Sequence, residues 1–266
     1  MLHLESLHQT FNAGRINEVK ALRGIDLHLD AGEFVTIIGS NGAGKSTLFN
    51  AIAGEFMPTN GRILLGGIDV TNWPEYKRAA LIGRVFQSPF HGTAANMTIA
   101  ENMSLAMLRS QKLGLRLGVS RRRKQKLADL LEPIGLGLEK RLDDRVDLLS
   151  GGQRQAMTLL MASLSLPRLL LLDEHTAALD PGTAVRILEI TQSVIEEQKL
   201  TTLMITHNMQ QALNYGSRSL MLHKGKIVLD IAQKEREGLT VQGLVNKFSE
   251  VKQETLMDDE LLLSNE

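Results

Sequence analysis

The sequence contains no cysteine and few aromatic residues. Of its 266 residues none is cysteine, and phenylalanine, tryptophan and tyrosine together make up 4%. The missing thiols exclude disulfide bridges, cysteine-ligated zinc, iron–sulfur clusters and a cysteine nucleophile. The shortage of aromatic rings argues against a surface that binds nucleic acid by stacking on its bases. The composition therefore excludes thiol chemistry and predicts that nucleic acid is not a partner.

The chain also has no excess of charge and no long apolar segment. Lys and Arg number 30, as do Asp and Glu, so the formal net charge is zero. A balanced charge gives no bulk attraction to nucleic acid or anionic lipid, although it does not exclude a local basic patch. No apolar run approaches the ~20 residues of a membrane helix, and the first residues show no signal-peptide pattern. We expect a soluble chain that reaches a membrane only through a partner.

Alternating strand and helix patterns predict an α/β fold. Polar and apolar residues alternate over 25–30, which is typical of a half-buried strand. Residues 34–38 form a continuous apolar run, which is typical of a strand buried on both faces. We also predict a hairpin over 61–70, strands over 169–172 and 202–206, a further hairpin over 219–229, and a helix that begins after Asp180. Strands that alternate with helices favour a mainly parallel sheet.

Residues 88–157 have a helical pattern and interrupt this alternation. Thr98 and Glu101 match a capping box, and a second helix is predicted over 126–131. We therefore predict one domain over 1–235, with a core of 1–87 and 158–235 and a helical subdomain of 88–157. Residues 236–266 are expected to form a C-terminal extension whose acidic last part is poorly ordered.

A glycine-rich loop between a predicted strand and a predicted helix is the most informative motif. Residues 39–47 match G-x-x-x-x-G-K-[ST]. Glycines let successive backbone N–H groups surround phosphate oxygens, and the following helix adds its positive N-terminus. Lys45 is expected to reach the β- and γ-phosphates, and the Ser46 hydroxyl is expected to bind Mg²⁺. The predicted phosphate-binding residues are Gly39, Ser40, Asn41, Gly42, Ala43, Gly44, Lys45, Ser46 and Thr47.

Two carboxylates follow another predicted buried strand. Asp173 is expected to hold Mg²⁺, and Glu174 is expected to polarise an attacking water. Taken alone, such residues often only solvate the end of a strand. The phosphate loop upstream favours the catalytic interpretation.

A third motif, Ser150-Gly151-Gly152-Gln153, precedes a helical pattern. A hydroxyl and two glycines at a helix start can bind a second anion, or can serve only as a helix cap. Two phosphate-binding helix ends in one chain suggest a nucleotide held between two chains.

In this order, the motifs resemble the nucleotide-binding subunit of an ATP-binding-cassette (ABC) transporter over about residues 2–235. The resemblance implies a P-loop NTPase core with an antiparallel β subdomain and an inserted α-helical subdomain. It implies that Phe11 stacks on adenine, that Gln87 senses Mg²⁺ and the γ-phosphate, and that His207 contacts the γ-phosphate. It also implies that Asp180 belongs to a loop linking two sites, and that residues 150–153 complete the ATP site of a partner subunit.

The resemblance further implies an ATPase that uses ATP and Mg²⁺ in a head-to-tail dimer of identical chains. A separate integral membrane permease and a solute-binding protein are the expected partners, with the chain on the cytoplasmic side of the membrane. Import of a small solute such as an amino acid or sugar is the favoured function. An ABC exporter and a non-transport ABC ATPase are the alternatives. A P-loop kinase would explain residues 39–47 but not residues 149–153.

Three features leave alternatives open. His175 stands where proline is commoner in the family, so it is either a group whose protonation near the γ-phosphate weakens Glu174 as a base, or a solvated loop residue. The basic run 121–126 is either a solvated helix start or a contact with anionic lipid. Met97, Met103 and Met107 either fill the core or form a surface that receives a permease helix.

Overall fold

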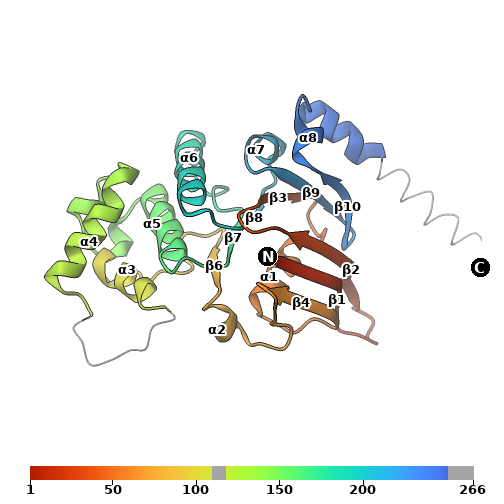
Figure 1. Ribbon diagram of the computed structural model, residues 1–266, viewed down its shortest axis with the longest axis horizontal. Helices are drawn as coiled ribbons and strands as arrows, with labels where there is room; N and C mark the ends of the chain where they lie inside the picture. The colour runs from red at the N-terminus through yellow and green to blue at the C-terminus, as the bar shows by residue number, and fades with distance from the viewer. Residues whose placement is uncertain (110–117, 251–266) are drawn as a thin grey trace, which may run out of the picture.

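The computed structural model describes residues 1–109 and 118–250, and two β-sheets organise this part of the chain (Figure 1). The larger sheet has the strand order β10-β9-β3-β8-β7-β6, and the smaller one has the order β2-β1-β4-β5. Strands β3 (Phe34–Gly39), β6 (Ile82–Val85), β7 (Leu169–Asp173), β8 (Thr202–Ile205) and β9 (Arg218–His223) run parallel. Strand β10 (Lys226–Ile231) is antiparallel to β9.

The parallel strands are buried because their sequences are mostly apolar on both faces. Strand β3 is buried from Phe34 to Ile38, as its continuous apolar run predicts, and Ile37 pairs with Ile205 and Leu220 on either side. Parallel strands place their carboxyl ends at the same edge of a sheet, where α/β proteins bind ligands. The residues that follow β3, β6, β7 and β8 therefore meet at this edge.

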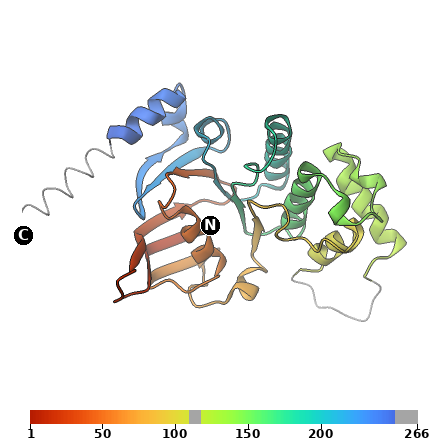
Figure 2. The ribbon, with the colours of Figure 1, turned by 180° about the vertical axis from the view of Figure 1, so that it is seen from behind.

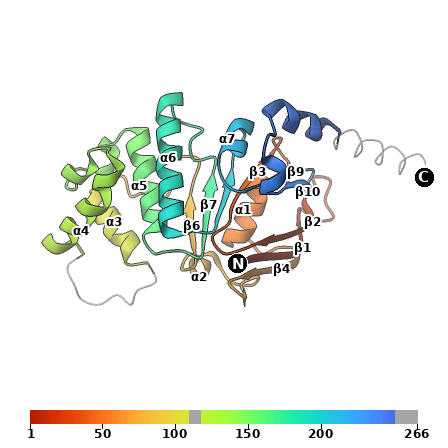
Figure 3. The same ribbon diagram turned by 45° about the horizontal axis from the view of Figure 1, so that its top comes forward.

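The smaller sheet is antiparallel and packs its apolar face inwards. It consists of β1 (Leu2–Phe11), β2 (Val19–Leu29), β4 (Asn60–Leu65) and β5 (Ile68–Asp69). The predicted alternation is confirmed on β2, where Ile25, Leu27 and Leu29 are buried, and the predicted hairpin over 61–70 is β4 with β5. Helix α1 (Lys45–Ala53) lies between the two sheets (Figure 3) and contributes to the core that they share.

A fully buried arginine binds the backbone carbonyls at the C-terminal end of α1. The guanidinium of Arg78, at the end of α2 (Glu75–Arg78), donates hydrogen bonds to the carbonyls of Ala51, Ile52, Thr71 and Trp73 at 2.7–2.9 Å. Two of these carbonyls belong to the last turn of α1, whose acceptors have no partner within the helix. Arg78 therefore fixes the helix that begins at the glycine-rich loop.

The helical subdomain lies at one end of the molecule (Figure 2). Thr98 caps α3 (Ile99–Met107) through the predicted capping box, and Ser120 caps α4 (Arg121–Leu131). Helix α4 therefore begins five residues before the predicted start at 126, because the cap precedes the arginine run. Short 3₁₀ turns, η1 (Glu132–Ile134), η2 (Leu138–Lys140) and η3 (Val146–Leu148), lead to α5 (Gly151–Ser163). The predicted subdomain boundary at 157–158 falls inside α5.

The C-terminal part returns to the larger sheet through α6 (Pro181–Gln198) and α7 (Met209–Asn214). Asp180 caps α6 as predicted and accepts a hydrogen bond from the Thr183 backbone at 3.0 Å. Helix α8 (Gln233–Arg236) and a helical stretch over 241–250 pack beyond β10, with Leu244 fully buried. The expected poorly ordered tail lies outside the described residues.

Candidate nucleotide-binding site

A polar cleft of about 820 Å³ opens at the carboxyl edge of the parallel strands. It brings together the glycine-rich loop after β3, Gln87 after β6, and Asp173 and Glu174 at the end of β7. Phe11, at the end of β1, forms another part of its wall. The topology thus assembles residues that are more than 150 positions apart in the sequence.

Backbone geometry explains the glycines of the loop. Gly44 caps α1 with φ of 103°, and a Cβ atom at this position would lie 2.6 Å from the carbonyl oxygen of Ala21. A Cβ at Gly39 would lie 2.3 Å from the carbonyl oxygen of Leu222. No side chain caps α1, so its first N–H groups keep their capacity for an anionic ligand. The loop has the properties of a phosphate site.

Lys45 lies within this loop rather than in the surrounding solvent. Its side chain is mostly buried, and Nζ donates hydrogen bonds to the carbonyls of Gly39 at 2.8 Å and Ser40 at 3.1 Å. These contacts hold the ammonium group at the mouth of the loop. Lys20, Arg23 and Lys224 also line the cleft. Sequence analysis missed these three residues, because only the fold brings them to the phosphate loop, and they add positive charge beside it.

Glu174 forms the centre of the predicted catalytic group. Its Oε2 accepts a hydrogen bond from Gln87 Nε2 at 3.3 Å and lies 3.6 Å from His207 Nδ1. Glu174 has φ of 43°, in a region that non-glycine residues seldom adopt, and its N–H donates to the Ile205 carbonyl. The structure thus brings Glu174, the predicted base, together with the two residues that the family resemblance implies to act on the γ-phosphate.

Asp173 is less accessible than Glu174 because it lies at the buried end of β7. Burial raises the pKa of its carboxyl, against the opposing effect of the nearby Arg84 guanidinium. Arg84 Nη2 lies 3.6 Å from Asp173 Oδ2 and also donates to Asn50 Oδ1 at 2.7 Å. Arg84 is a further residue that sequence analysis missed, since no motif contains it.

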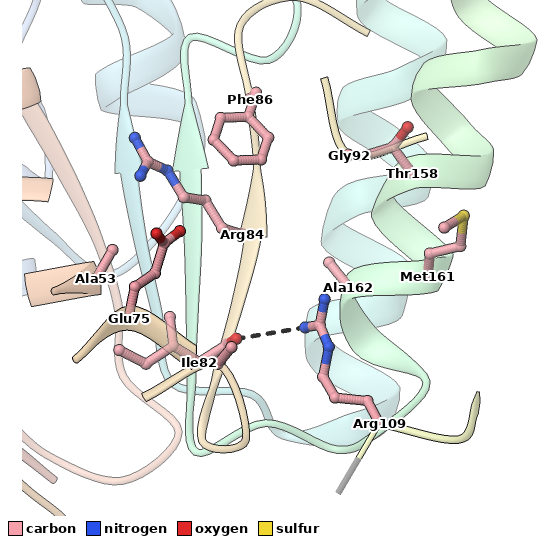
Figure 4. Close-up of a pocket in the computed structure, with 11 residues that line it drawn as sticks. Ala53, Glu75, Ile82, Arg84, Phe86, Gly92, Arg109, Thr158, Met161 and Ala162 are labelled. Carbon is pink, nitrogen blue, oxygen red and sulfur yellow. Dashed lines mark hydrogen bonds between the residues drawn. The ribbon is translucent and has the colours of Figure 1, made fainter. Parts of the chain in front are cut away.

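Arg84 also lines a second cavity, of about 220 Å³, between β6 and α5 (Figure 4). The apolar wall of this cavity includes Phe86 and Met161, and its base includes Arg109, which donates to the Ile82 carbonyl at 3.4 Å. Arg84 therefore stands between this cavity and the carboxylate of Asp173.

The oxygen donors of the larger cleft fit a magnesium ion. Ser46, Gln87 and Asp173 all line it, and hydroxyl, amide and carboxylate oxygens are ligands that Mg²⁺ accepts. Within residues 1–109 and 118–250, no group of three His, Cys, Asp or Glu side chains is placed to hold a metal by itself. Mg²⁺ usually completes its shell with water and substrate phosphates, so this small donor set suits it.

Phe11 has the exposure and position that an adenine-stacking residue needs. Its side chain is 36% exposed on the cleft wall, and its ring packs edge-to-face against Phe56 with centroids 5.4 Å apart. Its role toward adenine stays a prediction.

The predicted signature segment lies apart from this cleft. Of the described residues that line the cleft, none belongs to 150–153, and Asp180 is also absent from its wall. Ser150 and Gln153 instead form a reciprocal capping box at the start of α5. Gln153 further accepts from Arg141 and donates to the Leu136 carbonyl, both at 3.2 Å. Within one chain, these residues are separated from the phosphate loop.

The structure contradicts both interpretations of His175. The ring is 2% exposed, and its Nε2 lies 3.0 Å from Thr191 Oγ1 on α6. Burial lowers the pKa of His175 to about 4, so the imidazole is neutral at ordinary pH. His175 is therefore neither a solvated loop residue nor a group that titrates beside the phosphates. Sequence analysis erred because the burial depends on α6, which packs over the loop.

The remaining alternatives lie outside the cleft. Met103 is fully buried in the helical core and Met107 packs against it, so these two residues fill the core, while Met97 is half-buried. The basic run forms the first turns of α4, with Arg121 and Arg122 exposed and Lys124 paired with Asp143. The solvated helix start predicted for this run agrees with that exposure.

Comparison with known proteins identifies this arrangement. The ABC transporter family matches residues 22–177, which include the phosphate loop, the signature segment and the acidic pair. The chain belongs to the ABC transporter family. It is an ATP-binding subunit of such a transporter, with the ABC ATPase fold and ATPase activity.

Relatives of this ABC ATPase act in different transport systems. It is 46% identical over 248 residues to the tyrosine transport ATP-binding protein of Clostridioides difficile, covering 93% of this chain and 98% of that protein. It is 36% identical to the methionine import ATP-binding protein MetN 1 of Bacillus licheniformis, and the match covers 86% of this chain and 66% of that protein. The lipoprotein-releasing system ATP-binding protein LolD of Syntrophus aciditrophicus is 35% identical, and the match covers 86% of this chain and 99% of that protein.

Two solved structures have the same fold. A dimeric ATP-binding cassette in a post-hydrolysis state, bound to ADP and Pi, superimposes with a TM-score of 0.75 at 27% identity, covering 88% of this chain and 99% of that one. CbiO1 of Clostridium perfringens, part of the CbiONQ transporter complex, gives a TM-score of 0.74 at 26% identity. The match covers 92% of this chain and 93% of that one. No helix among the described residues of the ABC ATPase is long and apolar enough to span a membrane.

Proposed function

We propose that this ABC ATPase drives the uptake of a small solute, with an amino acid as the favoured class, through a separate membrane permease. The observation that carries the proposal is the grouping of Gln87 and Glu174 in the wall of a phosphate-binding cleft, with His207 Nδ1 3.6 Å from the Glu174 carboxylate. This grouping supports ATP turnover as the energy source. The 46% identity to a tyrosine transport protein over nearly the full length of both chains favours an amino acid.

Within one cleft, each residue has a separate task in hydrolysis. The loop N–H groups and Lys45 hold the phosphates, and Phe11 stacks on the base. Ser46, Gln87 and Asp173 would hold Mg²⁺, which when bound neutralises charge on the β- and γ-phosphate oxygens. Glu174 orients the attacking water and accepts its proton, while His207 contacts the γ-phosphate.

A second copy of the chain completes the site. The N-terminus of α5, with Ser150, Gly151 and Gly152, is suited to bind an anion and lies outside the wall of its own cleft. Leu148 is 64% exposed just before this end, and Val185 is 53% exposed on the adjacent α6, so the face around it is suited to burial against another chain. Head-to-tail pairing brings this end to the partner's phosphates. ATP binding then closes the dimer, and hydrolysis opens it.

The uptake proposal is tested with labelled solutes in cells of the source organism. Deletion of the chain should abolish accumulation of the transported amino acid, and the wild-type chain should restore it. Glu174→Gln should bind ATP and dimerise in it, yet fail to restore uptake, because the water lacks its base. Labelled tyrosine and methionine are measured beside a labelled sugar.

Unchanged uptake of every solute after deletion would overturn the import proposal. Accumulation of membrane-retained lipoproteins in the same deletion strain would instead favour the export alternative, which the similarity to LolD supports. Restoration of uptake by Glu174→Gln would show that the base is assigned wrongly.

A further inference from the structure

A short loop joins the catalytic strand β7 to helix α6 and carries Glu174 at its start. Two hydrogen bonds shape the loop from within, Ala177 N to the Glu174 carbonyl at 2.9 Å and Leu179 N to the Thr176 carbonyl at 3.2 Å. Asp180 ends the loop by capping α6. These contacts define a turn, and the Glu174 N–H bond to the Ile205 carbonyl at 3.1 Å ties its first residue to β8.

His175 links the middle of α6 to this loop. The ring and Thr191 are both buried, at 2% and 1% exposure, and His175 Nε2 lies 3.0 Å from Thr191 Oγ1. The Thr191 hydroxyl donates its own proton to the Ile187 carbonyl at 2.7 Å. The hydroxyl oxygen is therefore the acceptor, and His175 Nε2 carries the hydrogen. The two bonds form a chain that runs from the residue beside Glu174 to the backbone of α6.

The Glu174 backbone is tied to β8, but its carboxylate has only long contacts. Its backbone occupies the unfavourable left-handed region, which persists only where the surroundings enforce it. Its carboxylate contacts Gln87 at 3.3 Å and the 63% exposed His207 at 3.6 Å, both long for a restraining contact. A cavity of about 270 Å³, lined by Met204 and Ala184 among others, also borders the loop. One side of the loop therefore borders free volume, while His175 and Thr176 are buried on the other.

We propose that His175 is a positioning residue whose hydrogen bond to Thr191 holds the Glu174 carboxylate in line with the attacking water. This inference rests on the proposed role of Glu174 as the base in ATP hydrolysis. His175 itself does not touch the nucleotide, since its ring is directed into α6. Loss of the bond would misplace the base without changing the phosphate loop. A misplacement of about 1 Å can lower a rate by ~10²-fold.

The test compares matched variants of both partners. Thr191→Val removes the acceptor with little change of shape, whereas Thr191→Ser keeps the hydroxyl. His175→Leu removes the donor, whereas His175→Gln offers an amide N–H at a similar reach. We expect kcat to fall at least about tenfold in Thr191→Val and His175→Leu, with KM for ATP changed by less than about twofold. Thr191→Ser and His175→Gln should retain more of the wild-type kcat than their apolar counterparts.

A second measurement does not depend on turnover. Hydrogen exchange of the backbone amides at 174–179 should be faster in Thr191→Val than in Thr191→Ser, with the amides of α1 unchanged in both. Equal exchange in the two variants, or a folded Thr191→Val with wild-type kcat, would overturn the proposal. A raised KM with unchanged kcat would overturn it too. Failure of the wild-type chain to hydrolyse ATP would instead contradict the proposed function, while the exchange experiment would still decide on the anchor.

Discussion

Glu174 and His175 are adjacent residues in opposite environments. Glu174 faces the polar cleft beside His207, while the His175 ring lies under α6 and is almost completely buried. This arrangement places a neutral imidazole inside the protein. Burial of this imidazole lowers the free energy of unfolding only on acidification, when the unfolded chain can bind a proton that the folded chain excludes.

The buried His175 predicts a defined loss of stability in mild acid. Burial lowers its folded-state pKa from 6.5 to about 4, so between these values the unfolded state binds more protons. The free energy of unfolding should therefore be fully retained above about pH 6.5 and fall as the pH drops toward 4. At pH 5 the loss from this residue is about 2 kcal/mol. Urea unfolding of the nucleotide-free chain at pH 7.5 and pH 5 measures it.

His175→Gln is the control, because glutamine does not titrate in this range. The wild-type chain should lose about 2 kcal/mol more than this variant between the two pH values. Parallel losses in the two proteins would contradict the buried neutral state of His175.

At the level of elements, helix α1 depends on an arginine that lies outside it. Arg78→Met keeps most of the volume but removes the donor from four carbonyls, of which the two at the end of α1 are buried and the other two partly buried. The free energy of unfolding should fall by roughly 2–4 kcal/mol. ATP affinity should fall as well, because α1 carries the phosphate loop at its other end. Denaturant unfolding and nucleotide titration measure both effects.

Lys77→Met is the matched control for this prediction. Lys77 is the exposed neighbour of Arg78 on α2, and its substitution should change stability by less than about 0.5 kcal/mol. Equal effects of the two substitutions would show that Arg78 does not support α1.

Elements were predictable where their cause is local. The capping box at Thr98, the hydroxyl and glycines at 150–152, the cap at Asp180 and the apolar run of β3 identified helices and strands at or near their observed bounds. The phosphate loop and acidic pair were predictable for the same reason, since their chemistry is confined to a few adjacent residues. The sequence did not predict the roles of Arg78 and Arg84 or the burial of His175, because each depends on a partner element distant in the sequence. The order of the strands in each sheet could not be predicted either, because it depends on pairing between distant segments.

In the proposed head-to-tail dimer, each chain contributes two separate surfaces to two shared sites. The phosphate loop, Gln87, Asp173 and Glu174 gather at the edge of the larger sheet. The signature segment begins α5, which belongs to the helical subdomain (Figure 1). A head-to-tail dimer therefore predicts complementation between two inactive chains. Lys45→Ala disables the cleft. Ser150→Asp keeps a good helix cap but places negative charge against the partner's phosphates.

Each variant alone should lack ATPase activity, and an equal mixture should recover up to about a quarter of the wild-type rate. Random pairing makes half of the dimers mixed, and each mixed dimer has one intact site out of two. Ser150→Thr, which keeps the hydroxyl, should be active alone. A mixture as inactive as its components would contradict sites shared between chains. ATPase rates measured over a range of mixing ratios distinguish the outcomes.

In the proposed head-to-tail dimer, the capping box at the start of α5 prepares this segment to contact the nucleotide of the partner chain. Ser150 Oγ accepts the Gln153 N–H, and the Ser150 N–H is engaged by Gln153 Oε1. The serine is therefore left with its hydroxyl proton as a donor, next to the N–H groups of Gly151 and Gly152. The segment is already arranged as a receptor for an anion before any nucleotide arrives. When two chains close, little loop entropy remains to be lost, so ATP binding energy is available for moving the two bodies against each other.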